Sequence, residues 1–369
     1  KQVVHRAVHT AIFMAPAGGV LVAALGEAFA KPLLSTLNVP DDVFPYALLY
    51  LRIYLLGMPV ILLYNFEAAI FRSIGDTRTP LIALTLSGVL NVVLNLFFVL
   101  VLKMTVNGVA TATVLANCFS SLVLLRRLLT TDLPVRVTLH DLGIDVHIFK
   151  KIMSIGLPSG IQSAVFSISN IVIQSAINSL GTVVIAASSA AFNIEIMAYY
   201  VLNSFSQACT TFVGQNYGAG RLDRCRKTLI LCLVEDLIAS ACAIGLVLLC
   251  GKSLLAIFNN DPEVIAIGYT RLLIIFSAYT FSMLYEVMSG YLRGFGISLV
   301  PAVLTTLGVC GVRISWIQFV FPQSRTFSTI MIAYPASLST TALLIGIALF
   351  VYQPSRRYAA KQAKQYAGC

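Results

Sequence analysis

Long apolar runs separated by short polar turns follow one another along almost the whole chain. Each run holds about 20 residues or more, which lets one α-helix cross the hydrocarbon core of a bilayer, about 30 Å thick. Helix-breaking residues stand in the turns, for example in Gly75–Pro80 and Asn259–Pro262. The pattern predicts an all-α, polytopic membrane protein with ten spans, at about 8–30, 46–71, 79–102, 108–129, 150–179, 183–212, 228–257, 266–291, 298–321 and 328–352.

The second half of the chain repeats the first. Tyr64–Pro80 and Tyr285–Pro301 register without a gap at a spacing of 221 residues, so that Gly75 falls on Gly296. The second copy has about 75 further residues before its counterpart of the first copy's start. We therefore expect two six-helix lobes related by a parallel internal repeat, with the first two helices of the N-terminal lobe missing from this sequence.

The repeat and the charges together define four parts of the chain. One set of loops holds 18 Lys and Arg residues and the opposite set holds 4, while three more, Arg52, Arg271 and Arg313, fall within predicted spans. The positive-inside rule places the richer set, and both chain ends, in the cytoplasm. We expect the spans to lie in the plasma membrane. The predicted parts are an N-terminal lobe at 1–130, a cytoplasmic link at 131–149, a C-terminal lobe at 150–353 and a basic cytoplasmic tail at 354–369.

Composition and the spacing of cysteines and histidines argue against several classes of function. The chain is 58% hydrophobic and 11% charged, and its net charge of +10 lies in loops beside apolar runs instead of on a basic helix face, so no nucleic-acid partner is expected. The eight cysteines form no CxxC pair, and His5 and His9 have no third ligand nearby in sequence. We expect no metal and no cofactor apart from a coupling ion.

Three stretches are similar to the multidrug and toxin extrusion (MATE) family. They are Gly156–Gln162 (GLPSGIQ), Thr210–Gly220 (TTFVGQNYGAG) and Arg72–Pro80 (RSIGDTRTP), and 89–95 and 107–113 also resemble the family. The resemblance covers the whole chain. It implies a twelve-helix transporter, here without its first two helices, that exports amphipathic, often cationic compounds in exchange for H⁺ or Na⁺.

Charged side chains inside spans are candidates for function, because charge is costly in a membrane. A carboxylate that faces a cavity can bind a proton or cation in competition with a drug, so Glu195, with Asn193 beside it, and Glu286 are predicted coupling residues. Arg313 needs a carboxylate partner, and Glu286 is the first candidate. Such a pair either takes part in coupling or is purely structural, and in the second case Glu195 is left as the coupling residue. Glu67 either couples or reaches the cytoplasmic interface.

The helix after the Gly-Leu-Pro motif differs from the family pattern. Many members carry a Glu about two turns beyond the proline, where this chain has Phe166. Polar residues on this helix either line a wet cavity or bond neighbouring helices; they are Gln162, Ser163, Ser167, Asn170 and Gln174. Tyr64, Tyr199 and Tyr285 either stack on flat cationic drugs or only pack.

Other functions fit the same architecture. A flippase for a lipid-linked sugar would need a more strongly cationic cavity than Arg313 alone provides, and a truncated remnant would not transport at all. An intramembrane enzyme would need paired Asp, a Ser/His dyad or His-Glu-x-x-His on the spans, and the sequence has none there. We predict a monomeric antiporter, not an enzyme, whose partners are the lipid bilayer and small amphipathic or cationic molecules.

Overall fold

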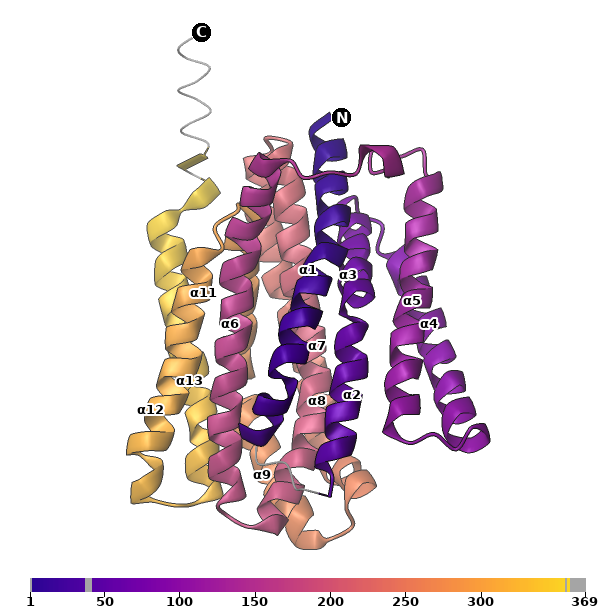
Figure 1. Ribbon diagram of the computed structural model, residues 1–369. Helices are drawn as coiled ribbons and strands as arrows, with labels where there is room; N and C mark the ends of the chain where they lie inside the picture. The colour runs from indigo at the N-terminus through magenta and orange to yellow at the C-terminus, as the bar shows by residue number, and fades with distance from the viewer. Residues whose placement is uncertain (1, 37–41, 356, 359–369) are drawn as a thin grey trace. The chain divides into compact units, whose positions relative to one another are not determined.

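The computed structural model describes residues 2–36, 42–355 and 357–358, and helices joined by short turns make up this part of the chain (Figure 1). Predictions that concern Lys1, Asp41 and most of the 354–369 tail lie outside the described residues. The ten predicted spans are confirmed as eight long apolar helices and two bent helix pairs. The helices are α1 (Gln2–Thr36), α2 (Phe44–Leu56), α3 (Met58–Ser73), α4 (Arg78–Leu96), η1 (Phe97–Val101), α5 (Val106–Thr130), η2 (Leu139–Asp141), α6 (Val146–Asn178), α7 (Thr182–Gly218), α8 (Leu222–Phe258), α9 (Pro262–Ser277), α10 (Tyr279–Gly294), α11 (Leu299–Thr305), η3 (Thr306–Gly311), α12 (Val312–Phe319), η4 (Phe321–Gln323) and α13 (Phe327–Tyr352).

The helices pack into two compact units, unit 1 (Lys1–Ile152) and unit 2 (Met153–Cys369). The internal structure of the two units follows the repeat of the sequence. Helices α3 and α10 begin and end 221 residues apart, and so do the bends that precede them, of 50° in unit 1 and 48° in unit 2. Gly75 (φ 88°) and Gly296 (φ 79°) both take a positive φ that favours glycine, in the turn that ends each helix.

The two bends are the part of the helical architecture that the apolar pattern does not predict. The first lies at Gly57, close to Pro59, which lacks the N–H that a continuous helix needs. The second lies at Ala278, where no proline marks it. Both runs stay apolar through the bend, so hydrophobicity alone indicates one straight helix in each case.

Two further helices contain a π-helical segment, η1 after α4 and η3 between α11 and α12. A π-helical turn holds more residues than an α-helical turn, and such segments are frequent at functional sites. The segment η3 directly precedes the short helix α12, which carries the intramembrane residue Arg313. Nothing in the sequence of 298–321 predicts this change of winding.

Close contact between α7 and α10 forms the central seam of unit 2. Ser206 Oγ donates to the backbone carbonyl of Glu286 (2.7 Å), and Thr210 Oγ1 donates to that of Gly290 (3.0 Å). A Cβ at Gly290 would lie 2.5 Å from the Ser206 carbonyl oxygen, and one at Gly294 would meet Val213 at 2.7 Å. Small residues four apart therefore let the two backbones approach, as in other membrane helix pairs.

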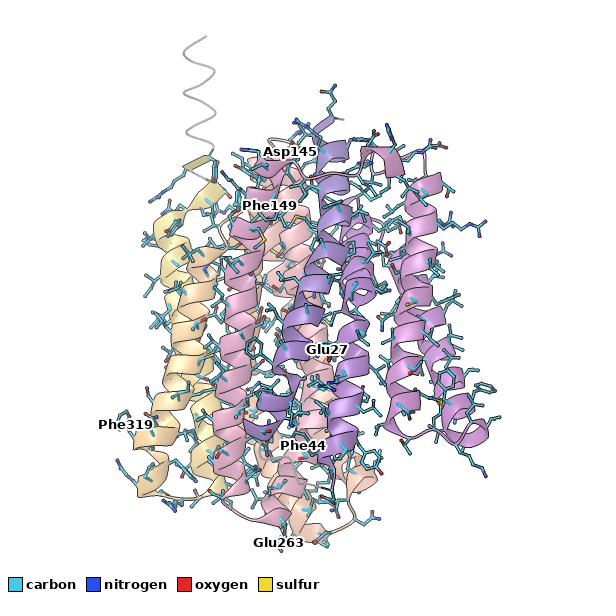
Figure 2. The ribbon with its side chains drawn as sticks, in the orientation of Figure 1. Glu27, Phe44, Asp145, Phe149, Glu263 and Phe319 are labelled. Atoms are coloured by element: carbon cyan, nitrogen blue, oxygen red, sulfur yellow. The ribbon has the colours of Figure 1, made fainter. Side chains whose placement is uncertain are left out.

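Unit 1 is built around α1, α3 and α5, whose core includes Val8, Ala68 and Leu124. The link between the predicted lobes is not wholly a polar loop, because Val135 and Val137 are buried in the same core. The link ends at Asp145, immediately before α6 (Figure 2).

Asp145 joins the start of α6 to α1. Its Oδ1 accepts the backbone N–H groups of His147 (3.0 Å) and Ile148 (3.1 Å), and its Oδ2 accepts from Arg6 Nη1 (3.1 Å). The hydrogen bond from Ile148, followed by that from His147 and the charge of Arg6, holds the pKa of Asp145 below its ordinary value.

The seam between α7 and α10 predicts that Gly290→Ala destabilises the protein. The added methyl group cannot fit against the Ser206 carbonyl, and such overpacking costs about 1–3 kcal/mol. Gly346→Ala is the matched control, because a Cβ added there would have nothing within 4 Å and alanine favours a helix by about 1 kcal/mol over glycine. Thermal unfolding in detergent should rank Gly290→Ala below the wild type and Gly346→Ala at or above it; equal unfolding temperatures would contradict the close seam.

The Asp145 cap predicts a pH-dependent contribution to stability. Because the folded-state pKa is lowered, the stabilisation is complete above the unfolded value of about 3.9 and is lost as the pH falls through the folded pKa. We expect Asp145→Ala to unfold below the wild type at pH 7, with the gap narrowing in acid. Unfolding temperatures in detergent between pH 7 and pH 3 measure this, and a gap that stays constant would rule out the charged cap.

Candidate functional site

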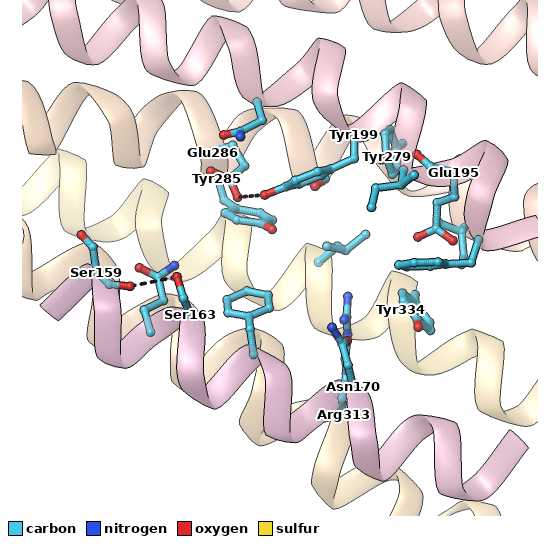
Figure 3. Close-up of a pocket in the computed structure, with 18 of the residues that line it drawn as sticks. Ser159, Ser163, Asn170, Glu195, Tyr199, Tyr279, Tyr285, Glu286, Arg313 and Tyr334 are labelled. Atoms are coloured by element: carbon cyan, nitrogen blue, oxygen red, sulfur yellow. Dashed lines mark hydrogen bonds between the residues drawn. The ribbon is translucent and has the colours of Figure 1, made fainter. Parts of the chain in front are cut away.

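Six helices of unit 2 line a cavity of about 480 Å³ (Figure 3). Helices α6, α7 and α10 supply most of its wall, and α9, α12 and α13 complete it. The wall mixes aromatic rings with amide, hydroxyl and charged groups. The structure brings these sequence-predicted residues together in it: Gln162, Ser163, Asn170, Glu195, Tyr199, Tyr285, Glu286 and Arg313.

Glu195 is paired with an arginine that sequence reasoning did not select as its partner. Arg271 Nη2 lies 2.8 Å and Arg271 Nε 3.1 Å from Glu195 Oε2, and Arg271 Nη1 donates to Ser188 Oγ (2.8 Å). The Arg271 side chain is 3% exposed and that of Glu195 13%. Burial and three hydrogen bonds make this a well-formed ion pair between α9 and α7. An arginine inside an apolar run was the available signal, but its partner depends on helix packing.

The predicted ion pair between Glu286 and Arg313 is wrong. No carboxylate lies within 4 Å of Arg313 in the described part of the chain; its Nε donates to Ser337 Oγ (3.0 Å), and its guanidinium carbon lies 4.1 Å from the centre of the Tyr334 ring. Glu286 Oε1 instead accepts a long hydrogen bond from the Tyr199 hydroxyl (3.4 Å). The bond from Ser206 fixes Glu286 on the α7 side, whereas Ser337 and Tyr334 hold Arg313 against α13.

The other two arginines within spans both have carboxylate partners. Arg52 Nε lies 3.2 Å from Glu27 Oε2 in unit 1, and Arg271 pairs with Glu195 in unit 2. Arg271 is buried as deeply as Arg313, so the expectation that Arg313 alone is deeply placed needs correction. Arg313 differs from both, because in the part of the chain that the structure describes its hydrogen-bond acceptor is the uncharged hydroxyl of Ser337.

Three predicted residues of unit 2 lie outside the cavity. The amide of Asn193 donates to the Ser189 carbonyl (2.9 Å) and lines an apolar groove instead, so it does not orient Glu195. Ser167 donates to the Ser163 carbonyl (3.1 Å), and Gln174 to Asn178 Oδ1 (2.8 Å). The cavity-facing residues of α6 are Ser159, Gln162, Ser163, Phe166 and Asn170. Ser167 lies at the side of this stripe, and Gln174 lies one turn beyond its last residue, Asn170; the polar pattern alone fixes neither limit.

Glu67 and Tyr64 belong to unit 1. Glu67 is 0% exposed, so the alternative in which it reaches the cytoplasmic interface is wrong. Its Oε2 accepts from Ser121 Oγ (2.9 Å), and its Oε1 has no hydrogen-bond partner among the described residues. Tyr64 is half-buried and packs against the core of unit 1, which favours its packing role.

Asp236 on α8 is a buried carboxylate that the sequence reasoning missed. Its Oδ1 accepts from Ser240 Oγ (2.8 Å), while its Oδ2 has no partner in the part of the chain that the structure describes. An acidic residue inside the apolar run 228–257 was the signal. Its carboxylate is 0% exposed and is absent from the cavity wall.

The structure also corrects the surroundings of His5 and His9. Asp141 joins them, with ligand atoms of the three residues within 4.8 Å of one another. However, His9 Nδ1–H donates to the His5 carbonyl (2.7 Å), and His9 Nε2 accepts the Thr138 N–H (2.9 Å). Because both ring nitrogens of His9 are engaged, the cluster does not offer three free ligands for a metal.

Comparison with known proteins assigns this chain to a family. The family model MatE matches residues 1–97 and 158–317. The chain belongs to the MatE family of transporters. The multi-pass helical fold and the resemblance found in the sequence agree with that membership.

Two relatives show the range of names within the MatE family. The probable multidrug resistance protein YoeA of Bacillus subtilis is 25% identical over 345 residues, which cover 91% of this chain and 74% of the relative. The FAD transporter of Shewanella oneidensis is 25% identical over 252 residues, which cover 66% of this chain and 55% of the relative.

Solved structures show the MatE fold directly. The crystal structure of MATE in the bent conformation matches with a TM-score of 0.85 at 20% identity, covering 99% of this chain and 80% of that one. A MOP superfamily transporter from Pyrococcus furiosus, with a binding pocket of reverse polarity, matches with a TM-score of 0.87 at 21% identity, covering 97% of this chain and 79% of that one. At these identities the likeness concerns the fold alone.

The buried pair in this MatE protein predicts strong coupling between two substitutions. Arg271→Gln leaves Glu195 without its cation and should destabilise unit 2 by about 3–5 kcal/mol. The double variant Glu195→Gln, Arg271→Gln removes both charges and should recover most of that loss. Unfolding in detergent of the wild type, the two single variants and the double variant gives the coupling energy. A double variant no more stable than Arg271→Gln would contradict the pairing.

Proposed function

We propose that this protein is a secondary active exporter that moves amphipathic or cationic compounds across the plasma membrane in exchange for H⁺ or Na⁺. The observation that carries the proposal is Glu286, a buried carboxylate on the cavity wall whose side-chain partner is the neutral hydroxyl of Tyr199. Relatives named as multidrug resistance proteins support the direction and the type of cargo.

Glu286 has the environment that a coupling residue needs. Among the described residues no cation lies within 4 Å of Glu286, and the charge of Arg293 on the same wall acts on it from farther away. A buried carboxylate without a close ion-pair partner is costly, so a proton, a sodium ion or a positive group of the substrate is favoured beside it. These three compete for one position, and binding of one helps to release another. Such competition links an inward flow of ions to outward transport of the compound.

Glu195 is the second candidate, and its geometry is less suited to coupling. Its charge is already compensated by Arg271, so an incoming proton would have to break a buried ion pair. We propose that the Glu195–Arg271 pair holds α7 and α9 in place while Glu286 exchanges ions. Glu195 couples only if the pair opens during the transport cycle.

Aromatic side chains supply the surface on which a flat substrate can rest. Phe166, Phe192, Tyr199, Tyr279 and Tyr334 all lie on the cavity wall, and Figure 3 shows Tyr199, Tyr279 and Tyr334 around one open space. Aromatic faces bind apolar and cationic groups with little demand for a particular shape. This surface is consistent with cargo that varies in structure.

The transport cycle that we propose exposes the site alternately to the two sides of the membrane as the two repeats change their arrangement. Both chain ends lie in the cytoplasm in this proposal, in keeping with the positions of Lys and Arg. The transporting species is a monomer, and the coupling ion is the only cofactor.

Ethidium accumulation in a pump-deficient bacterial host tests the proposal. The protein should lower accumulation, and a protonophore should abolish that effect if H⁺ is the coupling ion, whereas removal of external Na⁺ should do so if it is Na⁺. Glu286→Gln should export at least tenfold more slowly, since the uncharged side chain no longer exchanges ions, and Glu195→Gln should retain more activity.

Glu263→Gln is the matched control, because Glu263 is exposed at the start of α9 and absent from the cavity wall. Immunoblots of membranes must show equal amounts of every variant. If accumulation never changes while the protein is present, drug export is wrong and lipid-linked cargo is tested next. If Glu286→Gln exports as well as Glu263→Gln, Glu286 is not the coupling residue.

A further inference from the structure

We propose that Arg313 forms an anion-binding subsite in the cavity of unit 2, which selects amphipathic substrates that carry a carboxylate. The claim that the subsite selects which compounds are exported rests on the proposed export function. Binding of an anion at Arg313 can be tested without transport. Arg313 is 93% buried, lines the cavity and has no carboxylate partner among the described residues. Figure 3 shows Arg313 and Asn170 directed into the same space.

Neighbouring groups hold the guanidinium of Arg313 in a fixed orientation. Its Nε donates to Ser337 Oγ (3.0 Å), and that hydroxyl donates onward to the Tyr334 carbonyl (2.9 Å). The Tyr334 ring lies against the guanidinium, 4.1 Å from its central carbon. These contacts use Nε and the flat face, and among the described residues no hydrogen bond engages the terminal amino groups, which are left for another acceptor. A planar pair of N–H donors matches the two oxygens of a carboxylate.

The charges on the cavity wall favour an anion near Arg313. The wall carries Glu195, Glu286, Arg293 and Arg313, and Glu195 is neutralised by Arg271. Two guanidinium groups and one carboxylate remain, so the cavity is positive even when Glu286 is ionised and more positive when it is protonated. A purely cationic compound would leave Arg313 uncompensated, whereas a zwitterion satisfies Glu286 and Arg313 together.

The helical scaffold does not require an arginine at this position. At the repeat spacing of 221 residues, the sequence of unit 1 has Val92 at the place of Arg313, Thr113 at that of Tyr334 and Ala116 at that of Ser337. The π-helical segments of the two matching spans lie at different places, so this match concerns sequence position and not side-chain direction. The same succession of spans is therefore built without the arginine, its ring or its hydroxyl partner. Arg313 is therefore a buried charge that the helical fold does not require, and such a charge indicates a ligand.

Two dyes of the same skeleton separate this subsite from general hydrophobic binding. Tetramethylrhodamine is a zwitterion with a carboxylate, and its methyl ester is a cation that lacks it. Fluorescence polarisation with the purified protein in detergent should show tighter binding of the zwitterion. Arg313→Gln should weaken zwitterion binding about tenfold or more and leave ester binding within about twofold, since a charge-assisted hydrogen-bonded pair is lost.

Two further variants identify the cause of any change. Arg313→Lys keeps the charge but not the paired donors, so its affinity for the zwitterion should lie between those of the wild type and Arg313→Gln. Arg325→Gln removes an exposed arginine outside the cavity and should alter neither affinity. Equal losses for both dyes in Arg313→Gln, or no preference for the zwitterion in the wild type, would overturn the subsite.

A second measurement does not depend on either dye. Ser163→Cys places a thiol on the cavity wall, and peptide mass spectrometry follows its reaction with sulfonatoethyl and trimethylammonioethyl methanethiosulfonate apart from the native cysteines. The ratio of anionic to cationic reaction rates should fall about threefold or more when Arg313→Gln is added, because the local positive potential is removed. An unchanged ratio would overturn the anion subsite. Failure of both dyes to bind, with a ratio that does fall, would count against the proposed export function alone.

Discussion

The buried ion pair between Arg271 and Glu195 is the constraint on which the chemistry of unit 2 depends. An isolated charge is costly in a low-dielectric surrounding, and two hydrogen bonds from one guanidinium to one carboxylate oxygen remove most of that cost. The pair ties α9 to α7 and removes Glu195 and Arg271 from the set of free charges. The carboxylate of Glu286 and the guanidinium groups of Arg293 and Arg313 are then the charged groups of the cavity wall with no ion-pair partner within 4 Å among the described residues, and solutes can compensate them.

Glycines and hydroxyl side chains give that cavity its well-defined wall. The approach of α10 to α7 at Gly290 and Gly294 brings Ser206 and Thr210 into hydrogen-bonding distance of the α10 backbone. Glu286 therefore stands on a part of α10 whose backbone is hydrogen-bonded to α7, and not on a mobile loop. A rigid wall of this kind suits a site where small differences in charge decide which solute is bound.

Local hydrophobicity and the internal repeat were sufficient to predict the spans, because both are properties of the sequence over short distances. The partners of buried charges were not predictable in the same way. Arg313 contacts Tyr334 and Ser337 instead of Glu286, since the choice depends on how α12 and α13 are rotated and packed. For the same reason the pattern on α6 identified Ser163 and Asn170 correctly but placed Ser167 on the cavity face.

The π-helical segment η3 has a consequence for the direction of Arg313. One residue more in a turn shifts every later side chain by about 100° around the axis relative to a regular α-helix. A helical wheel drawn from Leu299 onward therefore gives the wrong face for every residue of α12. The direction of the Arg313 guanidinium is set by the helical winding of the segment that precedes it. An insertion or deletion within Thr306–Gly311 would therefore turn Arg313 away from the cavity without changing any residue that lines it.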